Sequence, residues 1–326
     1  MRLPLVCLLL VFLLGCARAE EPFFKKNDVV ALVGGEDMVV AGEDGYLELL
    51  LLRALPDHHL RFRSLAWEGD TVFEQNRDLN FPTWEEALDK IGATVVICQF
   101  GQMESLAGKE KLPEFIAAYE KLLERFSAAG KRRIVIVRPS YVEAASSMVP
   151  SLEATLLSAG GNVAEADKAI GEMAKRNGYL FADSARSLEL LRILGVDDNT
   201  GKWSPPSGLS ITRDGVHFSD IGQLFLSGFI CQDLGLPDPK SSDMIFDAKS
   251  SSPSPLLSLI RAKNLLWFNY WRVQNWAFLA GDRTNQPSSR DWKDPSKRWF
   301  PAEREEFLPL IESKEKEIDA LAAKLK

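Results

Sequence analysis

The sequence predicts an α/β domain with a doubly wound, mostly parallel five-stranded sheet, followed by a helical C-terminal appendage. Short apolar runs typical of strands alternate with helical stretches five times between residues 27 and 236. Such alternation is typical of parallel sheets with right-handed crossover helices. A stretch rich in Ser, Pro and Asp over residues 237–255 predicts a linker, and residues 256–326 predict a helical, aromatic-rich extension.

Five segments have the composition of strands. Most are short runs rich in Val and Ile that end at a turn signal such as Gly34-Gly35 or Pro139. The second alternates polar and apolar residues and continues into a loop that contains Gly69. The predicted strands cover residues 29–33, 61–67, 94–100, 133–137 and 179–182.

Helical spacing of apolar residues marks the connections between these strands. Thr83 predicts the N-cap of one helix, and Asn177-Gly178 predicts the C-cap of another. The helices expected in the domain cover residues 46–54, 83–91, about 115–130, about 163–178, 184–194 and the apolar stretch after Ser219-Asp220.

Two further helices are expected in the extension. Residues 257–277 are apolar on more than one side, which predicts that this helix packs on the main domain. In the alternative interpretation, some of its aromatic rings cover a site or stack on a sugar. Residues 303–326 are charged and amphipathic, which predicts a solvated helix with one docking stripe.

The N-terminal residues predict an export signal over residues 1–19. Arg2 supplies the positive start, and residues 3–14 form an apolar run that is too short to span a bilayer. Ala17-Arg18-Ala19 is a cleavage signal that would release a periplasmic or extracellular protein. Leu13-Leu14-Gly15-Cys16 resembles a lipobox, so a lipoprotein anchored through Cys16 is the alternative.

The charge balance argues against two classes of partner. Loss of Arg2 and Arg18 with the signal would lower the basic residues from 39 to 37, against 46 acidic residues. An acidic chain is a poor partner for nucleic acid or an anionic membrane. No further run of 18 apolar residues is present, so no transmembrane span is expected in the mature chain.

The cysteines are few for an exported protein. Outside the signal only Cys98 and Cys231 remain, and both lie in apolar runs. We expect them to be buried free thiols, with a disulfide between them as the alternative.

One polar segment stands out as a source of chemistry. Asp214 precedes His217 by three residues, a spacing that can place a carboxylate on the far nitrogen of the imidazole. The other two histidines, His58 and His59, are adjacent in a polar loop. Ligands of doubly wound sheets bind beyond the carboxyl ends of the strands. We therefore expect the loops after the first three strands to meet His217 at one edge.

Four sequence blocks, in this order, resemble the SGNH/GDSL hydrolases. They are Gly34-Gly35 after the first strand, residues 67–71, residues 100–105 and residues 214–217. The resemblance covers residues 27–235. It implies a flavodoxin-like sheet of the SGNH hydrolase type and an activity on acyl or acetyl esters, including esters of carbohydrates. It implies no cofactor.

The resemblance also implies roles for individual residues. In this family a serine attacks the ester, a histidine takes the serine proton and an aspartate orients the histidine. The oxyanion is held by the serine N–H, a glycine N–H of the second block and an asparagine side chain of the third. Here His217 matches the base, Asp214 its orienting partner and Gly69 the second-block glycine. Glu36 stands at the serine position and Met103 at the asparagine position.

These two departures weaken the expected chemistry. Glu36 is a poor nucleophile and has no proton for His217 to remove, and Met103 cannot donate a hydrogen bond. Loss of the nucleophile costs roughly 10⁶ in turnover, and loss of one oxyanion donor roughly 10²–10³. Gln102 is one residue out of register but could supply an amide, and Ser105 is a remote replacement nucleophile. The predicted oxyanion and binding set is Gly35, Gly69, Gln102 and Met103.

Three functions therefore remain open. The first is a protein that binds a small-molecule or carbohydrate ester after losing serine-hydrolase activity. The second is an esterase or deacetylase that uses water activated by His217. The third is a metal or acid–base site; its residues would be Glu36, Asp37, Asp214 and His217. Structural explanations compete with each role: Gly69 could serve turn geometry alone, and Glu36 and Asp37 could be charges in a surface loop.

Overall fold

The computed structural model describes residues 22–139, 153–183, 212–213, 216–236 and 253–325. Its centre is a five-stranded sheet with the order β2-β1-β3-β4-β5, and every neighbouring pair is parallel. The strands are β1 (Val29–Gly34), β2 (Arg61–Ser64), β3 (Val95–Gln99), β4 (Arg133–Val137) and β5 (Leu180–Ala182). The predicted fold class and all five predicted strands are confirmed.

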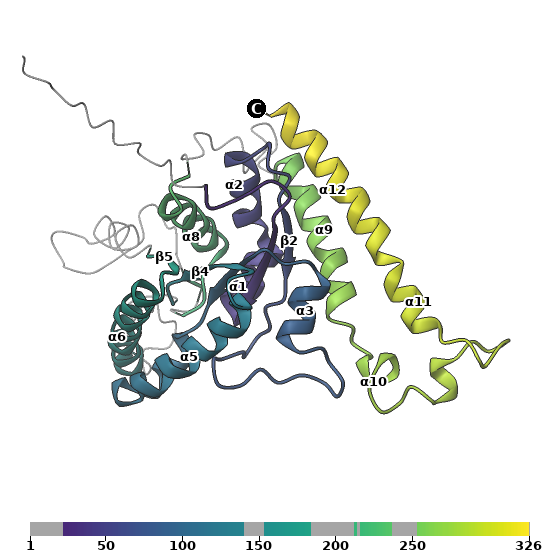
Figure 1. Cartoon of the computed structure of the whole chain (residues 1–326), viewed down its shortest axis with the longest axis horizontal. Coiled ribbons are helices and arrows are strands. Elements are labelled where there is room, and N and C mark those ends of the chain that lie inside the picture. Colours follow the sequence, from purple (N-terminus) through teal and green to yellow (C-terminus); the bar gives the residue numbers. More distant parts are fainter. Residues whose placement is uncertain (1–21, 140–152, 184–211, 214–215, 237–252, 326) are drawn as a thin grey trace, which may run out of the picture.

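The helices of the α/β domain follow the predicted order, with two additions (Figure 1). They are α1 (Glu36–Asp44), α2 (Tyr46–Ala54), α3 (Trp84–Lys90), α4 (Gln102–Ser105), α5 (Leu112–Ser127), α6 (Glu153–Asn177) and α8 (Asp220–Asp233). Helices α1 and α4 were not predicted. The helix predicted over residues 184–194 lies outside the described residues, as does most of the predicted linker.

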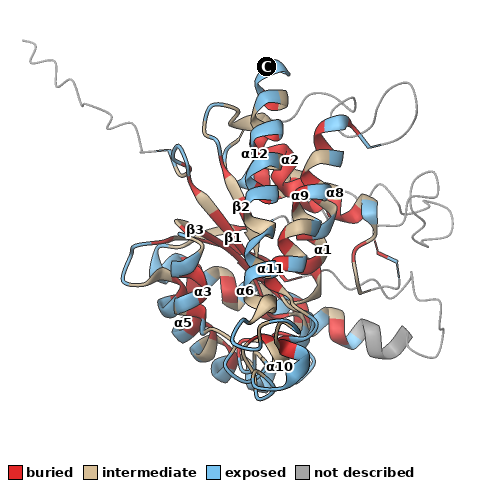
Figure 2. Ribbon diagram, turned by 90° about the vertical axis from the view of Figure 1, so that its right-hand side faces the viewer, coloured by how far each residue is buried: buried red, intermediate tan, exposed pale blue. Residues whose placement is uncertain are grey.

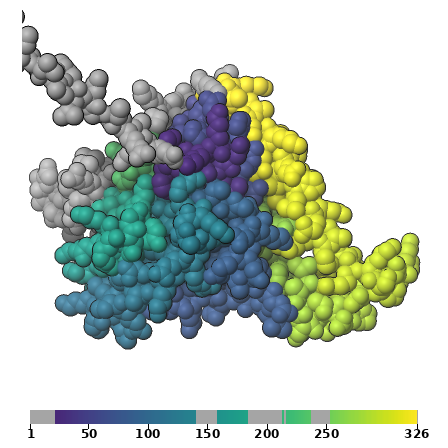
Figure 3. All heavy atoms as spheres, viewed as in Figure 1, coloured from purple at the N-terminus to yellow at the C-terminus, as the bar shows by residue number. Residues whose placement is uncertain are grey.

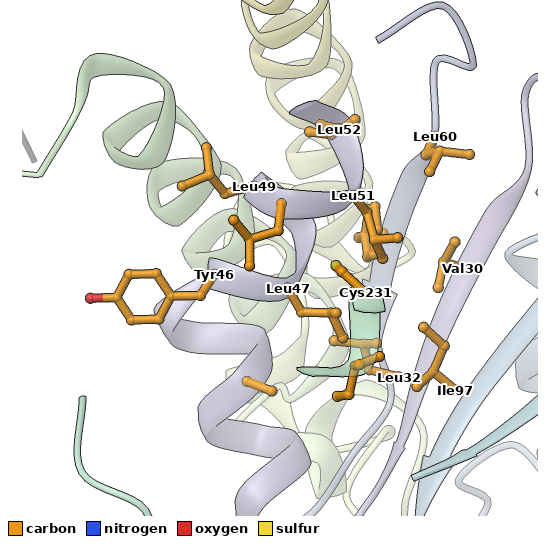
Figure 4. Packing of buried hydrophobic residues seen from close by; sticks show 14 of the residues in the cluster. Val30, Leu32, Tyr46, Leu47, Leu49, Leu51, Leu52, Leu60, Ile97 and Cys231 are labelled. Atoms are coloured by element: carbon orange, nitrogen blue, oxygen red, sulfur yellow. The ribbon is translucent and has the colours of Figure 1, made fainter. Parts of the chain in front are cut away.

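Each strand sends alternate side chains to opposite faces of the sheet. In β1, Val30 and Leu32 join a cluster with α2 and α8, whereas Ala31 and Val33 join a cluster with α3, α5 and α6. The buried residues concentrate on the strands and on the inner sides of the helices (Figure 2). Figure 4 shows the first cluster, in which leucines of α2 lie over the sheet.

The two described cysteines belong to different clusters. Cys98 packs on the side of α5, and Cys231 packs on the side of α2. Both are buried free thiols, as predicted. Burial raises the pKa of each thiol to about 12, so both stay protonated at neutral pH.

The C-terminal residues form further helices that pack against the α/β domain (Figure 3). They are α9 (Pro255–Trp271), α10 (Trp276–Leu279), α11 (Trp299–Glu305) and α12 (Phe307–Lys324). The sequence predicted one helix where α9 and α10 stand, and a single helix over most of α11 and α12. Helix α9 packs on α1, α2 and β2, which confirms the predicted packing of this segment.

Polar contacts fix the extension to the domain. Lys263 of α9 is fully buried, and its Nζ lies 2.9 Å from Oε2 of Glu48 in α2. Trp267 Nε1 donates to the carbonyl of Ser64 at 2.7 Å. Helix α12 runs beside β2, where Arg63 pairs with Glu315 at 2.6 Å. The extension therefore covers the edge strand of the sheet, which would otherwise present unpaired backbone groups.

The strand order also determines where a ligand can bind. The chain passes from β1 to β2 on one side and then crosses to β3 on the other. Such a reversal opens a crevice at the carboxyl ends of the two central strands, here β1 and β3. No helix among the described residues is both long and apolar enough to cross a membrane.

Candidate functional site

A cavity of about 240 Å³ lies at the carboxyl ends of β1 and β3. We call it the strand-end cavity; its lining comprises residues 35–37, 69–70, 99–104 and His217. The predicted site residues that line it are Gly35, Glu36, Gly69, Gln102, Met103 and His217. The expected convergence of the first three strand ends on His217 is thus confirmed. Asp214 lies outside the described residues.

Two glycines allow β1 to turn directly into α1. A Cβ on Gly34, whose φ is +149°, would lie 2.5 Å from the carbonyl oxygen of Gln99 in β3. Gly35 is the N-cap of α1, and its carbonyl accepts hydrogen bonds from the backbone N–H groups of Met38 and Val39. Residues 36 and 37 therefore form the first turn of a helix, where the macrodipole favours carboxylates. They do not form a surface loop.

Glu36 stands where the resemblance places a serine, and it is held by a cation. Its Oε1 lies 2.9 Å from Nη2 of Arg213, four residues before His217. The pair is partly exposed at the rim of the cavity. Residue 36 and the imidazole line one cavity, and the carboxylate of residue 36 is paired with a guanidinium.

Asp37 differs from Glu36 in being buried. Desolvation raises the pKa of its carboxyl to about 7, although His217 and a hydrogen bond from the backbone of Phe218 oppose this rise. Its Oδ1 has no hydrogen-bond partner among the described residues. Gln223 of α8 donates to the Asp37 backbone carbonyl at 3.2 Å. Asp37 is therefore a buried group beside His217 that titrates near neutral pH.

The second block forms a rigid wall of the cavity. Gly69 has a φ of +79°, and an added Cβ would meet no atom within 4 Å, so turn geometry alone explains this glycine. Asp70 makes a bidentate ion pair with Arg77, at 2.7 and 2.6 Å. Burial raises the pKa of the Asp70 carboxyl, and the hydrogen bonds and charge of Arg77 oppose this rise. The Arg77 guanidinium also lies 4.5 Å from the ring centroid of Trp67.

Glu104 ties the second and third blocks together, a role that sequence reasoning missed. Its Oε1 accepts from the backbone N–H of Val72 at 2.7 Å, and its Oε2 accepts from that of Gly101 at 2.9 Å. Burial raises the pKa of Glu104, and the two N–H groups oppose this rise. Gly101 followed three residues later by glutamate is the spacing of a capping box, a signal that could have identified α4.

The side chain of Gln102, which the sequence suggested as a replacement oxyanion donor, makes a hydrogen bond within the protein. Gln102 Nε2 donates to the carbonyl of Val216 at 3.1 Å, so its amide ties α4 to the segment that carries His217. This bond uses one of the two N–H groups of the amide, and Gln102 also lines the strand-end cavity, so its role as a replacement oxyanion donor stays a prediction. Met103, at the asparagine position, is 53 % exposed. Ser105 is buried, donates to the Gln102 carbonyl at 2.6 Å and does not line the cavity.

His217 is positioned by short backbone contacts. Thr212 and Phe218 form an antiparallel bridge, and the N–H of Arg213 donates to the His217 carbonyl at 2.9 Å. Ser219 then caps α8, because its Oγ accepts from the N–H of Gly222 at 3.1 Å. This cap starts α8 two residues after His217 and so helps to position the backbone that carries the imidazole.

The described residues give no support to the metal alternative. No group of three or more His, Cys, Asp or Glu side chains in the described part of the chain is arranged to hold an ion. Asp214, one member of the predicted set, lies outside those residues. What the described site offers is acid–base chemistry from Asp37 and His217, beside a carboxylate paired with Arg213.

No protein-family model matches the chain. No curated protein matches it either. Many of the similar solved structures are SGNH/GDSL-like lipases and acetyl xylan esterases.

Three of these structures illustrate the likeness. A GDSL-like lipase from Parabacteroides merdae has a TM-score of 0.47 and 14 % identity, covering 67 % of this chain and all of its own. An acetyl xylan esterase has a TM-score of 0.46 and 18 % identity, and the match covers 63 % of this chain and 98 % of the esterase. A gut microbial diltiazem-metabolizing enzyme has a TM-score of 0.49 and 16 % identity, covering 65 % and 48 %, so this chain spans about half of that enzyme.

Proposed function

We propose that this chain is an SGNH/GDSL-type protein that has lost serine-hydrolase chemistry and binds an ester of a hydroxyl-rich molecule, such as an acetylated carbohydrate. The observation that carries the proposal is the occupant of the nucleophile position. Glu36 stands there in an ion pair with Arg213, and no Ser, Thr or Cys is among the described residues that line the strand-end cavity.

The chemistry of the position supports this proposal. A carboxylate has no proton for His217 to remove, and its pairing with a guanidinium lowers its nucleophilicity further. The thioether of Met103 offers no hydrogen bond to an oxyanion. Loss of the nucleophile alone costs roughly 10⁶ in turnover.

The charge of the cavity favours a neutral ligand. Its described lining contains four acidic residues, Glu36, Asp37, Asp70 and Glu104, and no Lys or Arg. Carboxylates accept hydrogen bonds but repel anions. Sugar hydroxyls would donate to such oxygens. A neutral acetylated sugar therefore fits this wall better than a fatty-acid anion does.

The direct test puts the serine back at position 36 and the asparagine back at position 103. We expect wild-type protein to resist labelling by a fluorophosphonate probe and to hydrolyse p-nitrophenyl acetate no faster than background. Glu36→Ser should become labelled by the probe and should hydrolyse p-nitrophenyl acetate faster than background. The double variant Glu36→Ser with Met103→Asn should turn over roughly 10² faster than Glu36→Ser, because it adds an oxyanion donor. Glu36→Gln, which removes the charge without adding a nucleophile, is the matched control. Labelling of the wild type would contradict the proposal.

A second candidate, an esterase that uses activated water, is favoured by Asp37. This carboxyl has a pKa of about 7 and lies beside His217 in the same cavity. His217 could take a proton from water while the hydroxide adds to the ester carbonyl, and protonated Asp37 could donate to the leaving oxygen. In this case wild-type protein would hydrolyse p-nitrophenyl acetate without fluorophosphonate labelling, and His217→Ala or Asp37→Asn would abolish the activity.

We also propose that the protein is exported. The N-terminal pattern described above supports this, with cleavage before Glu20 or lipidation of Cys16 as its two forms. Mass spectrometry of the mature protein from its native host would distinguish them. A start at Glu20 supports a soluble exported form, a diacylglyceryl group on Cys16 supports an anchored form, and an intact Met1 contradicts export.

A further inference from the structure

The C-terminal extension touches one wall of the strand-end cavity, the turn over residues 67–70. In this turn the Trp67 N–H donates to the Gly34 carbonyl at 3.0 Å, and the Asp70 N–H donates to the Trp67 carbonyl at 3.1 Å. We call these residues the second-block turn. Its Gly69 and Asp70 line the cavity. Gly69 is exposed, and its N–H makes no hydrogen bond among the described residues, so this donor is free for a bound molecule.

Arg272, the C-cap of α9, reaches this turn from the extension. Its Nη1 lies 2.6 Å from Oε2 of Glu68, and its guanidinium lies 4.1 Å from the ring centroid of Trp67. The Glu68 side chain is 44 % exposed, so this ion pair contributes little by itself. The Arg272 side chain is only 16 % exposed, and a partly shielded guanidinium over an indole ring is a stronger contact. One side chain of the extension therefore holds the two residues directly before Gly69.

Aromatic side chains of the extension support the same stretch of chain. Phe81 makes an edge contact with Trp67, with 5.5 Å between the ring centroids. The Phe81 ring also lies 5.0 Å from that of Trp271 and 4.6 Å from that of Trp276. The Trp276 indole N–H donates to the Leu79 carbonyl at 2.9 Å. The stretch from Trp67 to Phe81 is therefore attached to α9 and α10 at both of its ends.

The α/β domain itself holds the chain before and after Gly69. The hydrogen bond from Trp67 to Gly34 ties the start of the turn to β1, and the Val72 N–H donates to Glu104 of α4 beyond its end. The ion-pair partner of Asp70 is Arg77, which belongs to the same loop. Among the described residues, the side chains of residues 67 and 68 thus depend on the extension for their polar and cation–π contacts outside this loop.

We propose that the extension is a working part of the strand-end site, with Arg272 as a positioning residue. Arg272 does not line the strand-end cavity, so it acts through the second-block turn. By holding Trp67 and Glu68, it keeps the Gly69 N–H directed at the carbonyl of a bound ester. This inference rests on the proposed function of the cavity, to which it adds a contribution from outside the α/β domain.

Amide hydrogen exchange in the full chain tests whether Arg272 holds the turn, without any ligand. The amides of Trp67 and Asp70 are hydrogen bonded, so their exchange reports local opening of the turn. In Arg272→Gln we expect both amides to exchange about 3–30-fold faster than in wild type, the range that corresponds to the loss of a partly shielded cation–π contact. The exchange of β3 amides such as that of Ile97 should stay unchanged.

Turnover tests whether the turn matters to the site. The background is Glu36→Ser, which the proposed function expects to hydrolyse p-nitrophenyl acetate. Adding Arg272→Gln should lower kcat about tenfold and leave KM nearly unchanged, because a donor to the oxyanion acts in the transition state. Adding Arg272→Lys, which keeps the charge beside Glu68 but loses the planar contact with Trp67, should have an intermediate effect. Titration with the fluorophosphonate probe counts the folded active sites, so a loss of folded protein is not mistaken for a lower kcat.

Arg304 of α11 provides the matched control. It donates to the Tyr270 carbonyl at 2.9 Å and lies 4.3 Å from the Tyr270 ring centroid. It is thus an arginine of the extension that packs on an aromatic ring of α9, and in the described part of the chain its contacts do not reach residues 67–70. Arg304→Gln should change neither the exchange of the turn nor kcat.

Three results would overturn the inference. The first is unchanged exchange of the Asp70 amide in folded Arg272→Gln. The second is an unchanged kcat when Arg272→Gln is added to active Glu36→Ser. The third is an equal effect of Arg304→Gln. An inactive Glu36→Ser would instead count against the proposed function, and the positioning role would fall with it, while hydrogen exchange would still show whether Arg272 holds the turn.

Discussion

Two ion pairs with the same contact distance show how differently two regions of this molecule use charge. Lys263 and Glu48 join the C-terminal extension to α2 at 2.9 Å, and Arg213 and Glu36 meet at the rim of the strand-end cavity, also at 2.9 Å. The first pair has side-chain exposures of 0 % and 6 %, whereas the second has 53 % and 32 %. The two pairs therefore differ in their exposure to water, which screens the charges of the rim pair and is excluded from the interface pair.

The difference indicates what each region can do. Breaking a buried pair leaves an uncompensated charge in a medium that cannot solvate it, so the extension is held to the domain. An exposed pair costs little to open. The pair of Glu36 and Arg213 can therefore open without loss of the fold.

The largest effect on stability is expected from breaking the buried pair. Lys263→Met should lower the free energy of unfolding by about 3–5 kcal/mol, because Glu48 would remain buried without its cation. Urea denaturation would measure this loss. The double variant Lys263→Met with Glu48→Leu should recover most of it, since both charges are then gone. A single variant as stable as wild type would show that this interface does not hold the extension.

A smaller effect, dependent on pH, is expected at Asp37. Its folded pKa of about 7 lies above its ordinary value of 3.8, so the folded state binds an extra proton between these two values. The stability contribution of this group is full below pH 4 and is lost as the pH rises through 7. Asp37→Asn should therefore be more stable than wild type by roughly 2–4 kcal/mol at pH 8.

The pH control for this prediction is internal. At pH 4 the same substitution should have little effect, because Asp37 is then protonated in the folded state and already about 40 % protonated in the unfolded state, given its ordinary pKa of 3.8. Denaturation curves of both proteins at the two pH values give the comparison. An equal effect of Asp37→Asn at pH 4 and pH 8 would contradict the burial argument.

The smallest effect is expected at the rim of the strand-end cavity. Arg213→Gln should change the free energy of unfolding by less than about 1 kcal/mol, and the change should shrink as salt is added. Thermal melts at low and high ionic strength would measure it. A loss as large as that predicted for Lys263→Met would remove the contrast between the two regions.

The sequence by itself determined the frame of this protein. Runs rich in Val and Ile marked β1, β3 and β4. Thr83 and Ser219 determined the starts of two helices through local hydrogen bonds. The four blocks sufficed to bring residue 36 and His217 to one cavity. Patterns of this kind could be read in advance because each depends on neighbours a few residues away.

Only the tertiary structure decided how the site residues are paired. Glu36 meets Arg213 across 177 positions of the chain, and Lys263 meets Glu48 across 215. The burial that raises the pKa of Asp37 and the hydrogen bond from Gln102 to Val216 likewise arise where distant segments meet. Periodicity reports which face of an element is apolar. It does not report which partner or how much water that face will meet, because desolvation and charge pairing depend on the assembled chain.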